Sequence, residues 1–305
     1  MSPIPRSGPR PSPALAPLVF SADDCYVLPL LATFSSLAAA NAHLLPDLRC
    51  LLLHEDLSES AQRRVRSHAD RLGLRVELTR MRLPDVDFKV NRGASRANYF
   101  RLSLGELLPD ENRALYLDAD LLVLGDLEPL LTTELAGELL AAVRDPVNPV
   151  YAEGFALPGW ERLGIKADQE YFNSGVMLLD LARCRAEHFF ERCFTFLRER
   201  PECIRLWDQD VLNWAAGDRW RRLDRAWNTF AMSALTRTPY VRYRSDHLVP
   251  LTTLVAEEED AKVLHYASTV KPWVPGYPPG PALDRYRAVL DSVHLAEAPD
   301  QGGGR

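Results

Sequence analysis

The chain has 305 residues, of which 47% are hydrophobic and 26% are charged, so it holds enough apolar material for a sizeable globular core. Its formal net charge of -6 argues against a nucleic-acid partner, because binding to a phosphate backbone requires a basic surface. No run of about 18 apolar residues is present, so we expect no transmembrane helix.

Cysteine content and the amino-terminal segment bear on the cellular compartment. The five cysteines are odd in number and never spaced as CxxC, which argues against a zinc knuckle and against a disulfide framework. Reduced thiols are typical of cytosolic proteins, so we expect a cytoplasmic location. Proline-rich residues 1–17 are too interrupted for a secretory signal and are predicted to form a disordered leader.

Strands and helices are predicted to alternate through the first part of the chain. Apolar Ala61, Val65 and Ala69 recur at helical spacing, and Gly73 supplies a stop signal. Alternation of this kind is typical of a parallel, doubly wound sheet. The expected elements are a strand within 17–24, a helix at about 26–42, a strand at 48–54, a helix from about 58 to 73, and a strand at 74–79.

The rest of the chain continues with apolar strands and amphipathic helices. Residues 113–117 form an apolar run without alternation, as expected of a strand that helices cover on both faces. The stretch 182–199, rich in Phe and Arg, predicts one amphipathic helix. The other expected elements are helices at 96–108, near Trp207 and at about 283–294, strands at 138–143, 175–181 and 261–268, and a loop at 271–281.

Two carboxylates, Asp118 and Asp120, follow the strand at 113–117. A buried carboxylate without a partner is costly, so a positive charge is expected beside them. Ligands bind beyond the carboxyl ends of strands in open α/β sheets, and residues i and i+2 of an extended segment project the same way. The pair alone is equally consistent with a turn whose aspartates cap a following helix. Together with an imidazole, the pair would suit a divalent cation, Mn²⁺ first and Mg²⁺ second.

Five sequence blocks follow one another along the chain: SADDCY at 21–26, YLDADLLVLGDLEPL at 116–130, YFNSGVMLLDL at 171–181, DQDVLNW at 208–214 and HYASTVKPW at 265–273. Their content and order resemble the retaining glycosyltransferases of family 8, over about residues 18–275. The resemblance implies an α/β fold: a single GT-A domain, Rossmann-like, with a mostly parallel central sheet. We expect this domain at 18–280, followed by a carboxyl-terminal helix and flexible tail at 281–305.

The resemblance also implies which residues hold the metal and the diphosphate of a UDP-sugar. Asp118, Asp120 and His265 resemble the metal ligands, and Lys271 resembles the family's diphosphate-binding lysine. A compact ammonium there would stabilise the departing β-phosphate. The plainer alternatives are a hydrogen-bonded core histidine and a solvated loop lysine. Ser268 stands where the family usually has a glycine.

Nucleotide contacts are implied for three further residues. Asp23 and Asp24 match the family's early nucleotide-contacting segment, in which Cys25 replaces a frequent asparagine. The alternative for Asp23 is a helix cap at the end of a strand. Arg101 is expected near the nucleotide and the first metal-binding aspartate, and its alternative is an exposed arginine on a surface helix.

The donor sugar is expected to meet Asn173, Asp145, Asp208 and Gln209. Asp208 would accept hydrogen bonds from donor hydroxyls, and Gln209 would lie near the anomeric carbon. The alternative for Asp145 is a turn residue before Pro146, and Asp208 and Gln209 are also consistent with capping the helix that follows. Asp208, Gln209 and Lys271 are the predicted catalytic residues.

The implied reaction is transfer of galactose or glucose from a UDP-sugar to an acceptor hydroxyl. The acceptor is a glycan, a lipid-linked glycan, a protein or a small molecule, and residues 146–170 are expected to shape that choice. Gln209 is a poor nucleophile, so front-face attack is favoured over double displacement. The few basic residues in 283–305 predict at most weak peripheral membrane association.

Two other functions are consistent with parts of the sequence. The first is a non-catalytic relative that binds a nucleotide sugar, which the departures at Cys25 and Ser268 favour. The second is a metal-dependent phosphoesterase that uses the same carboxylates. A phosphoesterase of that kind needs a second metal about 3.5–4 Å from the first, held by further Asp, Glu or His ligands.

Overall fold

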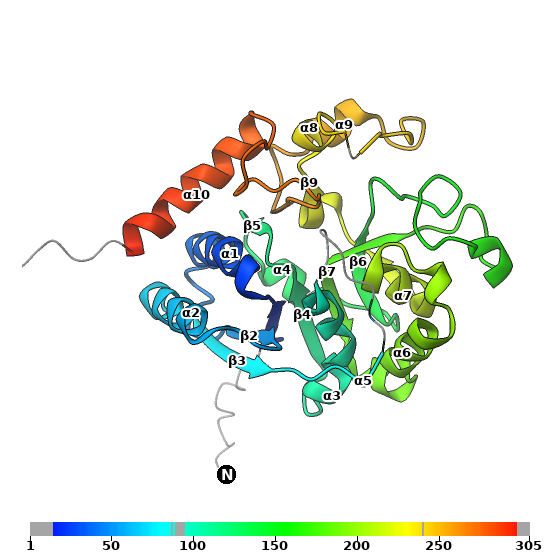
Figure 1. Cartoon of the computed structure of the whole chain (residues 1–305), viewed down its shortest axis with the longest axis horizontal. Helices are drawn as coiled ribbons and strands as arrows, with labels where there is room; N and C mark the ends of the chain where they lie inside the picture. The colour runs from blue at the N-terminus through cyan, green and yellow to red at the C-terminus, as the bar shows by residue number, and fades with distance from the viewer. Residues whose placement is uncertain (1–14, 87, 89–94, 240, 298–305) are drawn as a thin grey trace, which may run out of the picture.

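The computed structural model describes residues 15–86, 88, 95–239 and 241–297 (Figure 1). Most of the predicted leader and the end of the predicted tail lie outside these ranges. Within them, one sheet has the strand order β3-β2-β1-β4-β7-β6-β8 and a smaller one has the order β5-β10-β9. The strands are β1 (Leu18–Ser21), β2 (Arg49–His54), β3 (Arg75–Arg80), β4 (Arg113–Leu117), β5 (Leu121–Val123), β6 (Leu140–Arg144), β7 (Phe172–Asp180), β8 (Trp220–Arg222), β9 (Thr229–Phe230) and β10 (Val263–His265).

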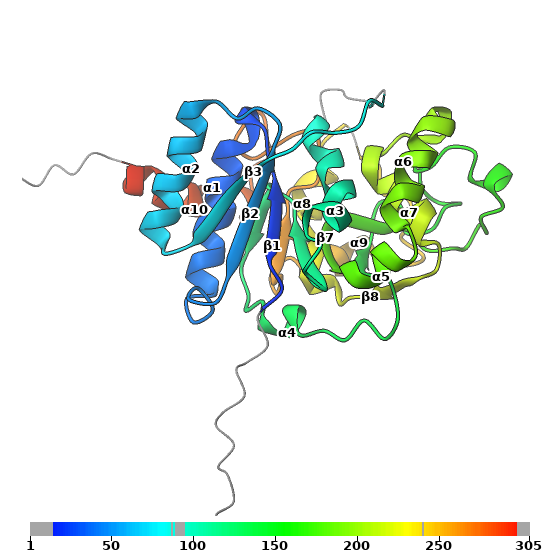
Figure 2. The same cartoon turned by 90° about the horizontal axis from the view of Figure 1, so that it is seen from below.

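Helices cover both faces of the large sheet (Figure 2). The α-helices are α1 (Val27–Ala40), α2 (Glu59–Leu72), α3 (Leu104–Leu107), α4 (Glu128–Leu131), α5 (Leu181–Ala186), α6 (Phe189–Glu199), α7 (Trp207–Ala216), α8 (Met232–Leu235), α9 (Leu251–Ala256) and α10 (Pro281–Glu297). The 3-10 helices are η1 (Asp24–Tyr26), η2 (Arg96–Ser103), η3 (Trp160–Leu163), η4 (Pro201–Cys203) and η5 (Arg225–Asn228). No described helix combines the length and the apolar composition needed to cross a membrane.

The large sheet is mostly parallel, as predicted. β1 pairs in parallel with β2 and β4, β2 pairs in parallel with β3, and β6 pairs in parallel with β8. β7 is the exception, because it runs antiparallel to both β4 and β6. The amino-terminal end of β7 therefore lies at the same edge of the sheet as the carboxyl-terminal ends of β1, β4 and β6.

Alternate side chains of the strands enter two separate cores, one on each face of the sheet. Leu18 and Phe20 of β1 pack with the helix on one face, where Phe34 of α1 contacts the Phe20 ring. Val19, between them, belongs to the other core, together with Phe190 of α6. Successive residues of a strand point to opposite faces, so one apolar run supplies both cores.

Two predicted helices differ from the structure. The single helix predicted at 182–199 is two helices, α5 and α6, because His188 adopts a left-handed conformation with φ 52°. Phe189 and Phe190, which follow the break, are both buried. The helix predicted at 96–108 is mainly the 3-10 helix η2, which begins at a capping box formed by Ser95 and Asn98, with one α-helical turn after it.

The small sheet holds the Asp118–Asp120 segment against α1 and β10. The Thr33 hydroxyl of α1 donates to the Leu121 carbonyl at 2.7 Å and lies 3.1 Å from the Ala119 carbonyl. β10 pairs antiparallel with β5, so that His265 is opposite Leu121. This register brings a histidine from the end of the chain next to two aspartates from its middle.

Candidate active site

A pocket of about 450 Å³ lies at the edge of the large sheet where β1, β4 and β6 end and β7 begins. Asp24 does not line it: its carboxylate accepts a hydrogen bond from the Ser58 backbone N–H at 3.0 Å. The other predicted site residues all line the pocket, and they are Asp23, Arg101, Asp118, Asp120, Asp145, Asn173, Asp208, Gln209, His265 and Lys271.

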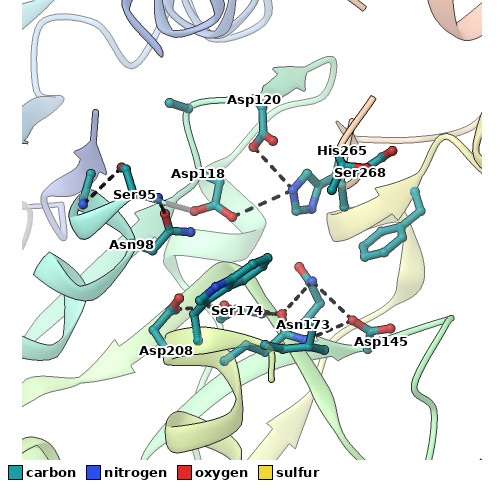
Figure 3. Close-up of a pocket in the computed structure, with 18 of the residues that line it drawn as sticks. Ser95, Asn98, Asp118, Asp120, Asp145, Asn173, Ser174, Asp208, His265 and Ser268 are labelled. Carbon is teal, nitrogen blue, oxygen red and sulfur yellow. Dashed lines mark hydrogen bonds and ion pairs between the residues drawn. The ribbon is translucent and has the colours of Figure 1, made fainter. Parts of the chain in front are cut away.

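Asp118, Asp120 and His265 converge at one end of the pocket (Figure 3). One ligand atom from each lies within 4.8 Å of the others. His265 Nε2 is 3.8 Å from Asp118 Oδ2 and 3.4 Å from Asp120 Oδ1. Its other ring nitrogen, Nδ1, is 2.9 Å from Asn228 Oδ1, which fixes the ring orientation as in many metal-binding histidines. Two carboxylates and an imidazole at this spacing fit a divalent cation.

Lys271 supplies the positive charge beside Asp120. Its Nζ lies 2.5 Å from Asp120 Oδ2 and donates to the Tyr266 carbonyl at 3.0 Å. The Lys271 side chain is only 12% exposed, so the alternative interpretation, a solvated lysine in a loop, is wrong. Burial raises the pKa of Asp120, but Lys271 and His265 outweigh that effect and hold the pKa below its usual range.

Arg101 joins the metal end of the pocket to the sugar end. Its guanidinium contacts Asp118 Oδ1 at 2.7 Å and Asp208 Oδ2 at 3.1 Å. It also donates to the Ser174 carbonyl at 2.7 Å and stacks over the Tyr116 ring. The Arg101 side chain is 2% exposed, which excludes the alternative of an exposed arginine on a surface helix. Burial raises the pKa of Asp208 to about 7, and the Arg101 charge opposes that rise.

Gln209 is fixed by hydrogen bonds from both ends of its amide. Its Oε1 accepts from Asn173 Nδ2 at 2.8 Å and from the Ser174 N–H at 3.0 Å. Its Nε2 donates to Asp145 Oδ2 at 3.1 Å. The other Asp145 oxygen accepts backbone N–H groups of the following turn, so Asp145 combines the turn role with a place in the pocket.

The helix-cap interpretation of Asp208 and Gln209 is wrong. Both residues lie in the first turn of α7, whose N-cap position is Leu206. Asp210 instead accepts the backbone N–H groups of Arg205 and Leu206. The side chains of Asp208 and Gln209 are therefore left to face the pocket.

Asp23 combines its two predicted roles. Its Oδ1 accepts from the backbone N–H groups of Cys25 and Tyr26 at 3.0 and 3.2 Å and so begins η1. It also lines the pocket. The Ser268 hydroxyl, which also lines the pocket, accepts from the Val270 N–H at 3.0 Å and so orders the segment between His265 and Lys271.

Sequence reasoning missed two residues that support the metal end. A Cβ on Gly175 would lie 2.4 Å from His265 Cε1 and 2.9 Å from Asp118 Oδ2, so only glycine lets β7 pass behind both side chains. Asn228 bonds His265 and donates to Asn173 Oδ1 at 2.8 Å. Gly175 follows YFNS within a block already singled out, whereas nothing in the sequence near Asn228 pointed to a site.

Comparison with known proteins gives the family. Residues 17–275 match the family described as glycosyl transferase family 8. The chain belongs to glycosyl transferase family 8. A solved structure of the galactosyltransferase LgtC, in complex with donor and acceptor sugar analogs, is similar to this chain, with a TM-score of 0.72 and 25% identity, covering 90% of this chain and 95% of that one. The prediction of a GT-A glycosyltransferase fold is thereby confirmed.

Curated relatives support the same family membership. General stress protein A of Bacillus subtilis is 26% identical over 263 residues, which cover 84% of this chain and 86% of the relative. The lipopolysaccharide 1,2-glucosyltransferase of Escherichia coli is 34% identical over 183 residues, or 59% of this chain and 49% of the relative. Glycosyltransferase GlyF of Streptococcus pneumoniae is 25% identical over 84% of this chain, which spans 56% of the relative's length.

Family 8 membership makes this chain a glycosyltransferase. The phosphoesterase alternative finds no support in the site. Among the described residues, the other group with metal-binding composition consists of exposed His43, Asp126 and Glu128. None of the three lines the pocket, so the described chain offers no second metal position beside Asp118 and Asp120.

Proposed function

We propose that this family 8 enzyme is a divalent-metal-dependent, retaining hexosyltransferase that transfers galactose or glucose from a UDP-sugar to an acceptor hydroxyl. Mn²⁺ is the preferred ion and Mg²⁺ a weaker substitute. The observation that supports the proposal is the layout of one pocket: a metal-binding group with a lysine at one end, and a fixed cluster of amides and carboxylates at the other.

The nucleotide and diphosphate occupy the end of the pocket between β1 and β10. Asp23 accepts hydrogen bonds from the uridine. The ion held by Asp118, Asp120 and His265 supplies positive charge to the diphosphate when it is bound. Lys271, already beside Asp120 at 2.5 Å, donates to the β-phosphate and offsets the negative charge that grows on it.

The donor sugar lies against Asp208, Asn173 and Gln209. Arg101 holds the Asp208 carboxylate from behind, so its free lone pairs face the pocket and accept from sugar hydroxyls. Gln209 presents its amide near the anomeric carbon. Because that amide already bonds Asn173 and Asp145, it positions the sugar and does not attack it.

Transfer then proceeds on one face of the sugar. The acceptor oxygen forms a bond to the anomeric carbon as the bond from that carbon to the β-phosphate oxygen breaks. The acceptor proton passes to the departing phosphate oxygen. An uncharged amide at Gln209 is a poor nucleophile, which favours this route over a covalent glycosyl-enzyme.

A donor-hydrolysis screen tests the proposal without knowledge of the acceptor. Purified enzyme is incubated with a panel of UDP-sugars and Mn²⁺, and UDP release is measured before and after EDTA. We expect slow release from UDP-galactose or UDP-glucose, abolished by EDTA and restored better by Mn²⁺ than by Mg²⁺. Asp120→Asn should lose it, while Asp126→Asn, an exposed aspartate outside the pocket, should keep it.

Activity that is indifferent to chelator would refute the metal assignment. Absence of release from every UDP-sugar would favour the non-catalytic relative that binds a nucleotide sugar. We further propose a single catalytic domain at 18–280 and a cytoplasmic enzyme, consistent with the reduced cysteines of the described chain.

A further inference from the structure

We propose that the acceptor is a glycan with an anionic substituent, a carboxylate or a phosphate, and that Arg205 and Phe155 form the subsite that recognises it. The inference rests on the proposed function, because it assigns the acceptor side of the same pocket. It adds a substrate class and two specificity-determining residues.

Arg205 and Phe155 come from two different segments and meet at the mouth of the pocket. Both line the pocket, and the Phe155 side chain is 44% exposed. The guanidinium of Arg205 is exposed and donates through Nη1 to the Phe155 carbonyl at 3.3 Å. An accessible aromatic ring beside a cation offers a face for a sugar ring and a donor for an anion on it.

The charges of the pocket single out Arg205. Arg101 is paired with Asp118 and Asp208, and Lys271 with Asp120. Arg205 has no carboxylate within ion-pair distance in the described part of the chain, although five aspartates line the same pocket. An unpaired guanidinium keeps its bidentate donors for a carboxylate or a phosphate.

The position of Arg205 assigns it to the acceptor and not to the diphosphate. It lies three residues before Asp208, next to the loop that contains Phe155, and so belongs to the sugar end of the pocket. The metal end already has Lys271. An anion that meets Arg205 is therefore carried by the second substrate.

A buried carboxylate holds the two segments in place. Asp210 is fully buried and accepts from the N–H groups of Leu157 at 2.8 Å and Arg205 at 2.6 Å. Leu157 and Trp207 have φ of 41° and 52°, a strained left-handed conformation for residues with side chains. Strain of this kind persists where surrounding contacts enforce it and is common at functional sites. The subsite is thus a fixed part of the fold.

The test measures glycan binding, which requires no turnover. Fluorescently labelled enzyme, with UDP and Mn²⁺ present, is applied to an array of matched oligosaccharide sets. Each set holds a neutral glycan, its uronic-acid analogue and its phosphorylated analogue. We expect at least one anionic member to bind about 10- to 100-fold more tightly than its neutral partner, as for one hydrogen-bonded charge pair. The two anionic members distinguish a carboxylate from a phosphate.

Two substitutions make the result specific. Arg205→Gln should remove the anionic preference, and Phe155→Ala should weaken neutral and anionic members alike. Arg242→Gln removes the same charge from an exposed arginine outside the pocket and should keep the preference. Equal binding of neutral and anionic glycans, binding of none, or a preference retained by Arg205→Gln would overturn the inference. Failure of UDP-sugar hydrolysis in a parallel assay would refute the proposed function, while the Arg205-dependent binding would still stand.

Discussion

Lys271 and Asp23 line the same pocket, but the proposed mechanism gives them different kinetic signatures. Lys271 faces charge that develops on the β-phosphate as the donor bond breaks. Lys271→Ala should therefore lower kcat by about 10²–10³, because the lost interaction is stronger in the transition state than in the ground state. Asp23→Ala should raise KM and leave kcat nearly unchanged, because the uridine is held equally in both states.

Steady-state kinetics of the two variants, with the donor that the wild type hydrolyses, decide between these roles. The Asp23 variant also loses the cap of η1, so its melting temperature must be measured alongside. If the Lys271→Ala enzyme kept the wild-type kcat, Lys271 would not stabilise the departing β-phosphate. The segment around Ser268 would then have another function.

Gly175 is predicted to be essential for metal binding although it holds no ligand atom. In Gly175→Ala the new methyl group would meet His265 Cε1 at 2.4 Å and Asp118 Oδ2 at 2.9 Å, so both ligands must move. We expect Mn²⁺ affinity, measured by calorimetry, to fall by about tenfold or more, as for loss of ligand orientation. Gly105→Ala is the control: its methyl group would meet the Phe190 ring at 2.8 Å, and neither residue lines the pocket, so Mn²⁺ affinity should not change.

At the scale of elements, Asp210 connects the start of α7 to the loop that follows β6. It accepts from Leu157 N–H, Tyr171 Oη, Arg205 N–H and Leu206 N–H, all between 2.6 and 2.8 Å. Asp210→Asn replaces one acceptor oxygen with a donor that faces other donors. We expect the free energy of unfolding to fall by about 2–4 kcal/mol in chemical denaturation.

Faster proteolysis between residues 150 and 165 should accompany that loss, because the loop would no longer be tied to α7. Asp218→Asn, at an exposed position just after α7, should change the free energy of unfolding by less than about 0.5 kcal/mol. Equal stability of Asp210→Asn and wild type would mean that the four hydrogen bonds do not hold the loop.

At the scale of the whole molecule, the predicted metal ligands come from both sheets. Asp118 follows β4 of the large sheet, and His265 ends β10 of the small one. Bound Mn²⁺ and UDP should therefore stabilise the entire fold, by about 2.7 kcal/mol when the ligand is at 100 times its Kd. Thermal melting with and without Mn²⁺ and UDP measures the effect. His265→Ala should remove most of the shift, and an undiminished shift would place the metal elsewhere.

The carboxyl-terminal helix gives little basis for membrane attachment. The bases in 283–305 are Arg285, Arg287 and Arg305, and this stretch also carries four acidic residues. The Arg285 guanidinium donates to the Glu258 carbonyl, and one face of α10 packs against α1, so Arg287 is the one exposed arginine of the described part of this helix. We expect weak sedimentation with anionic vesicles at physiological salt. Strong sedimentation would indicate a membrane-binding surface elsewhere.

Local sequence signals were sufficient for most elements and for the chemistry of the site. The strand at 113–117, the helix start at about residue 58 and the stop at Gly73 occur where they were predicted, because hydrophobic periodicity and left-handed glycine depend on nearby residues. The ordered blocks identified the family, and the resemblance pointed to ten pocket-lining residues, eight of them within the blocks, since a motif keeps its residue types together with their spacing.

Tertiary structure alone decided how those residues meet. No glycine or proline marks the break at His188, and nothing near Asn228 announces its bond to His265. The sequence also carried no sign that Asp24 lies outside the pocket lining, because its carboxylate is held by the Ser58 N–H at the start of α2. The strand order and the packing of distant segments set burial and distance. For that reason the sequence by itself determined which chemical groups were present. Only the folded chain decided that Arg101 is buried, that Asp210 ties two loops together, and that Arg205 is left without a carboxylate partner in the described structure.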